Sequence, residues 1–219
     1  MTFEGFPVAA LDFYDDLEVD NTKSFWEAHK HIYRDAVKAP FDAVAAAVAE
    51  EFGPLKIFRP YRDVRFAKDK TPYKAHQGAF VGTGPATGWY VELSSHGLRT
   101  GAGFYEASGP RLAAFRDAVA DERTGPALEA ILEVLTGTGM TVGGDRLKTR
   151  PRGYDPDHPR LELLKHRSLT IGRSHGFEPV IHTPAALDLI REDWRACRPL
   201  LEWLADATAG VPDDVRIRR

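Results

Sequence analysis

One stretch, from Arg59 to His76, gathers the residues best suited to bind an anion. It contains six lysines and arginines against two aspartates, a net charge of +4, whereas the whole chain carries −3. Arginine presents a planar fork that fits phosphate or carboxylate, and lysine adds a point charge. Concentrated positive charge in an acidic protein predicts a site for a small anion, such as a phosphorylated ligand. The predicted ligand residues are Arg62, Arg65, Lys68, Lys70 and Lys74.

Three other interpretations of this stretch stay open. Asp63 and Asp69 can neutralise part of the charge, which would leave an ordinary solvated strand at the edge of a sheet. The stretch could instead dock an acidic partner, which would make the chain a non-catalytic protein–protein interaction module. Tyr61, Phe66 and Tyr73 could also stack nucleic-acid bases. The acidic remainder of the chain and a pI of about 6.2 make nucleic acid the least favoured partner.

A second candidate is the run Arg152-Gly-Tyr-Asp-Pro-Asp-His-Pro159. Asp157 and His158 could act as a general base and its orienting partner. Arg152 and His158 could also join the anion site. Residues that could complete such a pocket are Lys165, His166, Arg167 and Arg173. The plainer alternative is a helix N-cap at Asp155 with proline at the first helical position.

The remaining chemistry-bearing residues match no catalytic or metal-binding signature. His29 and His31 point to different faces of a predicted helix, and no histidine pair has the His-Glu-x-x-His spacing, so we expect no metal ion. The glycines form neither a dinucleotide fingerprint nor a P-loop, so we expect no cofactor. Cys197 lies on the apolar stripe of the last predicted helix, which favours a core position. Because spacing assembles no nucleophile, base and oxyanion donor, it stays open whether the protein is an enzyme.

Composition and length are those of a globular protein. Hydrophobic residues make up 43% and charged residues 28% of the 219 residues, which excludes a disordered chain. The single cysteine cannot form an intrachain disulfide, which suits a reducing compartment. The first 17 residues lack a basic start followed by an apolar run, and no stretch approaches the ~20 apolar residues of a spanning helix. We therefore expect a soluble cytoplasmic protein without a membrane segment; the sequence leaves its oligomeric state undetermined.

Hydrophobic spacing predicts helices first, then strands, then helices again. The first helix is expected over 8–18. A second helix should begin at Asn21 or Ser24, because Ser24-Phe-Trp-Glu27 resembles a capping box. Pro40 should kink this second helix or start a new one, and Gly53 should end it. Expected strands are 61–67, 78–81, 89–93 and 98–105, with a turn at 68–72 and a loop over 82–88. Later helices should begin near 108, 124, 155 and 183, with short strands at 141–148 and 169–173. This order predicts an α+β fold whose mainly antiparallel sheet, at about residues 60–105 plus later short strands, is flanked by N-terminal and C-terminal helices.

Three segments resemble a family known as domain of unknown function 2461. The run Tyr61-Arg-Asp-Val-Arg-Phe-Ala-Lys-Asp-Lys-Thr-Pro-Tyr-Lys74 closely resembles its signature. Asn21-Thr-Lys-Ser-Phe-Trp26 is similar to its Asn-rich helix entry, and Arg152 to Pro159, followed by Leu163-Leu-Lys165, is similar to its later motif. The resemblance implies a single domain over residues 1–219 and brings no catalytic role. Two departures are visible: the aromatics Phe25-Trp26 are reversed, and Ala67 replaces an expected serine beside Lys68.

Overall fold

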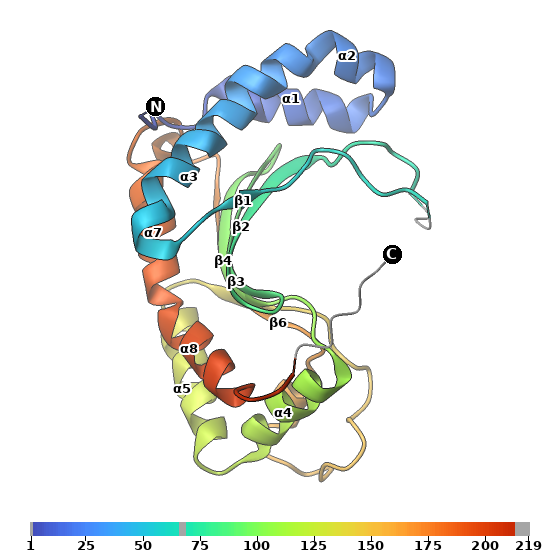
Figure 1. Ribbon diagram of the computed structural model, residues 1–219, viewed down its shortest axis with the longest axis vertical. Helices are drawn as coiled ribbons and strands as arrows, with labels where there is room; N and C mark the ends of the chain where they lie inside the picture. Colours follow the sequence, from blue (N-terminus) through green and yellow to red (C-terminus); the bar gives the residue numbers. More distant parts are fainter. Residues whose placement is uncertain (1, 66–68, 213–219) are drawn as a thin grey trace. The chain divides into compact units, whose positions relative to one another are not determined.

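The computed structural model describes residues 2–65 and 69–212 (Figure 1). Its central feature is a six-stranded antiparallel sheet in the order β1-β2-β3-β4-β6-β5, with helices before and after it in the chain. The strands are β1 (Lys56–Ile57), β2 (His76–Gly84), β3 (Thr87–Ser94), β4 (Gly97–Phe104), β5 (Thr141–Gly143) and β6 (Leu169–Gly176). The predicted α+β fold is confirmed.

The chain divides into two compact units. The first unit comprises Met1–Val81, Tyr90–Thr100 and Ser174–Asp193, and the second comprises Gly82–Trp89, Gly101–Arg173 and Trp194–Arg219. Strands β2, β3, β4 and β6 each contribute residues to both units. The expectation of a single domain stays a prediction.

The helices of the first unit come mainly from the N-terminal part of the chain. They are α1 (Val8–Val19), α2 (Lys23–Ile32), a π-helical segment (Tyr33–Lys38), α3 (Ala39–Phe52), a 3₁₀ turn (Pro179–His182) and the start of α7 (Ala186–Ala196). Helices α1 and α2 lie side by side in Figure 1. Phe6, Tyr14, Leu17 and Phe41 are fully buried and form part of the core. The predicted first helix and the stop at Gly53, whose φ is +100°, are confirmed.

One detail of the N-terminal helices agrees with expectation and one differs. Pro40 lies in the first turn of α3, directly after the π-helical segment, where the turn widens and the Ala39 amide bonds to the Arg34 carbonyl. Proline has no amide hydrogen and its ring crowds the carbonyl four residues back, which a wider turn relieves. The predicted caps of α2 are wrong because Thr22, with Oγ1 3.2 Å from the Phe25 amide, is the N-cap.

Two predicted segments around the sheet are wrong. Residues 61–65 do not form the described part of the strand expected over 61–67: Tyr61 makes an isolated bridge to Tyr73, while Asp63 accepts the Arg65 amide and so turns the chain. Residues 66–68 lie outside the described ranges. The segment 82–88 is mostly strand, because β2 continues to Gly84 and β3 starts at Thr87. The predicted hairpin of β3 and β4 is confirmed.

The second unit contains the remaining helices. They are α4 (Gly109–Ala120), α5 (Thr124–Gly137), α6 (Leu161–Leu164) and α8 (Arg198–Ala207). Phe115, Leu128, Leu164 and Trp194 are fully buried within this unit. Pro199 lies in the first turn of α8, which follows α7 after Cys197. No helix in the described part of the chain has the length and apolar character needed to cross a membrane.

Two predicted elements of the second unit are wrong in their extent. The strand expected over 141–148 ends at Gly143, and Gly144 follows with a φ of +110°. The helix expected at Asp155 begins at Leu161 instead, because Asp155 accepts the Asp157 amide and closes a turn. Pro159 also disfavours a helical conformation for the residue before it.

Candidate functional site

The basic stretch forms an irregular arm whose two ends are joined at its base. The Arg62 amide donates to the Pro72 carbonyl at 2.8 Å, and the Lys74 amide donates to the Pro60 carbonyl at 2.8 Å. The arm leaves the sheet after β1 and returns into β2 (Figure 1). We call residues 59–75 the arm, and its base is the paired part around Tyr61 and Tyr73.

Asn21 fixes the base of the arm against the start of α2. Its side-chain amide donates to the Tyr73 carbonyl and accepts the Tyr73 amide, both at 3.1 Å, as a neighbouring strand would. The Trp26 indole stacks on the Tyr73 ring with centroids 4.4 Å apart and planes 8° from parallel. Tyr61 packs beside both rings. The structure therefore brings together the first two segments that carry the family resemblance.

Most of the predicted arm cations have partners within the arm. Arg62 binds Asp69 and the Thr71 hydroxyl, and Arg65 forms a two-pronged pair with Asp63. Lys70 donates to the Val64 carbonyl at 2.9 Å. Lys68, the remaining predicted cation before Lys74, lies outside the described residues.

These pairs also hold the two arm carboxyl groups in the ionised form. Hydrogen bonds from Arg65 lower the pKa of Asp63 to about 2. Bonds from the Thr71 amide and hydroxyl, and then from Arg62, lower the pKa of Asp69 to about 2. Much of the positive charge of Arg62 and Arg65 is thus balanced inside the arm.

Lys74 and Arg59, at the base, differ from Arg62 and Arg65, which have carboxylate partners. Among the described residues, neither has a carboxylate within ion-pair distance. The Lys74 ammonium lies over the Phe58 ring, 5.3 Å from its centroid. Partial burial lowers the pKa of Lys74, and the neighbouring Arg59 and Arg62 cations lower it further. Two cations without a carboxylate partner among the described residues therefore lie near each other at the base of the arm.

Beside Lys74, three polar side chains meet on one face of the sheet in the first unit. The Tyr90 hydroxyl donates to Glu92 Oε2 at 2.6 Å, and His76 Nε2 lies 3.7 Å from the same oxygen. These side chains alternate with buried residues such as Val91, so they occupy the more exposed face, which we call the open face. Burial, followed by the charge of Glu92, raises the pKa of Tyr90 far above its ordinary value.

Glycine at position 78 makes room for this arrangement. A Cβ atom there would lie 2.5 Å from the Tyr90 hydroxyl oxygen and 3.0 Å from two ring carbons. The Tyr90 ring therefore crosses Gly78 closely, and the Phe58 ring lies 6.5 Å away, centroid to centroid. On the buried face of the sheet, the Tyr33 hydroxyl donates to Gln77 at 2.7 Å. Burial raises the pKa of Tyr33 to about 12.

The later sequence motif belongs to the second unit, where it contacts the end of α4. Arg160 donates to the carbonyls of Val119 and Ala120. His158 Nδ1 accepts the Arg160 amide at 3.0 Å, while Nε2 lies 3.4 Å from the Ala120 oxygen. Arg152 is exposed. Ligand binding by Arg152 and His158 stays a prediction.

The other residues suggested around that motif have partners of their own. Lys165 pairs with Glu162 at 2.5 Å, and Arg167 pairs with Asp145 at 3.1 Å. Since the arm belongs to the first unit and this motif to the second, the two sets are treated as separate sites. Within the first unit, the structure places His76 beside Glu92.

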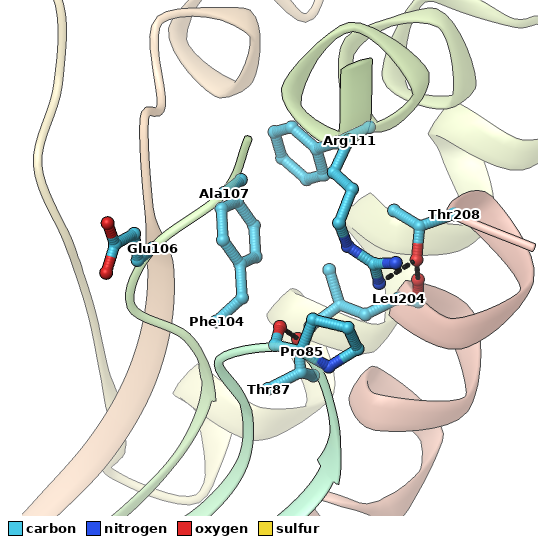
Figure 2. A pocket seen from close by; sticks show the side chains of 9 residues that line it. Pro85, Thr87, Phe104, Glu106, Ala107, Arg111, Leu204 and Thr208 are labelled. Carbon is cyan, nitrogen blue, oxygen red and sulfur yellow. Dashed lines mark hydrogen bonds between the residues drawn. The ribbon is translucent and has the colours of Figure 1, made fainter. Parts of the chain in front are cut away.

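The second unit also contains a small cavity beside Arg111 (Figure 2). Its volume is about 10 Å³, roughly what one water molecule requires. The Arg111 guanidinium points toward Thr208 and donates to its hydroxyl at 2.7 Å (Figure 2). The cavity is too small for a metabolite. Across residues 2–65 and 69–212, no three His, Cys, Asp or Glu side chains are grouped to hold a metal ion.

Sequence reasoning missed Tyr90 and Glu92. Their positions two residues apart in the predicted strand 89–93 place them on one face, and that alternation was the available signal. His76 ends the basic stretch, and the sequence alone assigns it no role. Its proximity to Glu92 depends on strand pairing, which spacing along the chain does not specify.

Fold and site define a class: an α+β protein with a six-stranded antiparallel sheet and a polar cluster on its open face. The chain belongs to the family described as conserved hypothetical protein (DUF2461), whose match covers residues 9–203. The resemblance seen in the three sequence segments is thereby confirmed. No curated protein and no solved structure matches the chain.

Proposed function

We propose that this protein binds a small anionic ligand, such as a phosphate or a phosphorylated metabolite, at the base of the arm. Lys74 and Arg59 would make the principal contacts, with Arg62 beside them. The observation that carries the proposal is the position of these two cations, which have no carboxylate partner among the described residues. An anion between them would offset the mutual repulsion of the positive charges.

The geometry also supports a site that is already formed before the ligand arrives. Asn21 and Trp26 hold Tyr73, the residue before Lys74, against α2. The Lys74 stem is positioned by the contact of its ammonium with Phe58. Pre-positioned cations lose less conformational freedom on binding, which favours affinity for a small ligand.

Substitution of Lys74 tests the proposal. Calorimetric titration with inorganic phosphate, at pH 7 and low ionic strength, should show binding to the wild type that weakens about tenfold or more in Lys74→Met, because one charge-assisted contact is lost. Lys70→Met is the matched control: it removes the same charge from the same arm, but from a lysine that bonds to Val64. It should bind phosphate almost as the wild type does.

Two results would contradict the anion site. Equal phosphate affinity of the wild type and Lys74→Met would exclude a contact by Lys74. No phosphate binding by the wild type, together with binding of an acidic peptide such as oligoglutamate, would instead favour a protein-docking arm. That docking role is the alternative interpretation of the same basic stretch.

A further inference from the structure

The cluster of His76, Glu92 and Tyr90 has features of a binding site rather than of ordinary packing. Glu92 is only 20% exposed, and its Oε2 is approached by a tyrosine hydroxyl and a histidine ring instead of an arginine or lysine. His76 is 37% exposed, so its ring reaches solvent. A shielded carboxylate that faces an accessible imidazole is a common way to orient the histidine.

The three side chains have distinct parts in this arrangement. The Tyr90 hydroxyl donates a hydrogen bond to Glu92 Oε2 and so holds that carboxylate in place. The carboxylate in turn favours the His76 tautomer that carries hydrogen on Nε2, the nitrogen facing Glu92. Nδ1 is then a hydrogen-bond acceptor. The His76–Glu92 distance of 3.7 Å exceeds a hydrogen bond, and such contacts commonly shorten when a ligand binds.

A continuous set of contacts connects this cluster with the proposed anion site. Lys74 lies over Phe58, and Phe58 neighbours the Tyr90 ring that donates to Glu92. His76 follows Lys74 by two residues, at the start of β2. From β4, the positive charge of Arg99 acts on Tyr90. A ligand held by Lys74 could therefore extend across Phe58 toward His76.

We propose that His76, Glu92 and Tyr90 form a subsite that binds a hydroxyl group of the ligand whose anionic group is held by Lys74. The inference rests on the proposed function and specifies its ligand class. That class is a small molecule with a phosphate at one end and a hydroxyl group several bonds away, as in a polyol phosphate. His76 Nδ1 accepts the hydroxyl hydrogen, and Glu92 keeps the imidazole in the orientation and tautomer that this bond requires.

Two probes that differ in their hydroxyl groups test the subsite: glycerol 3-phosphate and propyl phosphate. Calorimetry on the full chain should show that the wild type binds glycerol 3-phosphate about three- to tenfold more tightly than propyl phosphate. This ratio corresponds to the net free energy of one hydrogen bond. His76→Leu should abolish this preference while still binding propyl phosphate. Glu92→Gln should reduce the preference, because the neutral amide orients His76 less strongly.

His96→Leu is the matched control. His96 is exposed in the turn between β3 and β4, so the preference for glycerol 3-phosphate should persist. Equal affinity of the wild type for the two probes, or an unchanged preference in His76→Leu, would overturn the hydroxyl subsite and leave the anion site intact. Failure of both probes to bind the wild type would instead refute the anion site, and the subsite with it. Circular dichroism confirms that each variant is folded.

Discussion

At the scale of single residues, a buried histidine in the second unit connects stability with pH. His166 is fully buried, its Nδ1 lies 2.8 Å from the Ser168 carbonyl, and its Nε2 has no hydrogen-bond partner among the described residues. Burial lowers the pKa of His166 and Arg146 lowers it further, whereas the Ser168 carbonyl and Glu162 oppose these effects. The ring is therefore neutral near pH 7, with its hydrogen on Nδ1.

This geometry predicts that acid destabilises the protein through His166. The unfolded chain takes up a proton on this residue below about pH 6.5, whereas the folded protein does so at a lower pH. The free energy of unfolding should therefore fall as the pH decreases from 6.5 toward the folded pKa. His166→Asn retains a donor for the Ser168 carbonyl but cannot titrate, so urea unfolding between pH 7 and 5 should show a shallower loss.

His96→Leu provides the comparison for this measurement. It removes an exposed histidine from the turn between β3 and β4, and the pH dependence should remain that of the wild type. If His166→Asn lost stability between pH 7 and 5 as steeply as the wild type, the buried ring would not be the source of the effect.

Individual residues also show how far sequence could identify the candidate site. The +4 charge of the arm and its arginines and lysines predict an anion site, but not which cations are balanced internally. Arg65 meets Asp63 because the chain turns there, whereas Lys74, at the paired base, has no carboxylate partner within the described part of the chain. The roles of His76 and Glu92 depend on neighbouring strands. Such side-chain partners follow from tertiary geometry, which residue spacing does not contain.

At the scale of elements, strand β4 depends on a glycine where it meets β6. Gly103 has a φ of +134°, and a Cβ there would overlap the Leu169 carbonyl oxygen and crowd Thr170. Both the backbone conformation and the close approach exclude a side chain. Gly103→Ala should therefore lower the free energy of unfolding by about 2–4 kcal/mol, because it strains the backbone and separates the strands. Urea unfolding at pH 7 measures the loss.

Gly109→Ala is the control for the Gly103→Ala variant. Gly109 begins α4, and nothing lies within 4 Å of a Cβ at that position. The same one-carbon addition should therefore be neutral or slightly stabilising. Similar unfolding midpoints for the two alanine variants would show that β4 and β6 tolerate a side chain at Gly103.

The elements that sequence predicted correctly are those with a strong local signal. Helix α1 has helical spacing, α4 has a Ser108 cap, and α5 begins at Thr124-Gly-Pro. The failures occur where side chains compete with the backbone. Asp63 and Asp155 each accept an amide two residues later, and this turns segments predicted to be a strand and a helix. Gly82 and Gly84 indicated a loop, although both lie within β2.

At the scale of the whole molecule, the two compact units share strands. Residues 76–81 of β2 belong to the first unit and 82–84 to the second, and β3, β4 and β6 are divided in the same way. A strand is stabilised by the strands with which it pairs, so unfolding of one half of a strand destabilises its other half. We therefore expect the units to unfold together, in keeping with the predicted single domain over residues 1–219.

The tryptophans allow this cooperativity to be measured. Trp26 belongs to the first unit, whereas Trp89, Trp194 and Trp203 belong to the second. A variant that retains only Trp26 and the single variant Trp26→Phe should each give the same urea midpoint by fluorescence as by far-ultraviolet circular dichroism. Each variant is compared with itself, so a general loss of stability on substitution does not affect the comparison. Separate midpoints for the two probes within either variant would show that the units unfold independently, as two domains would.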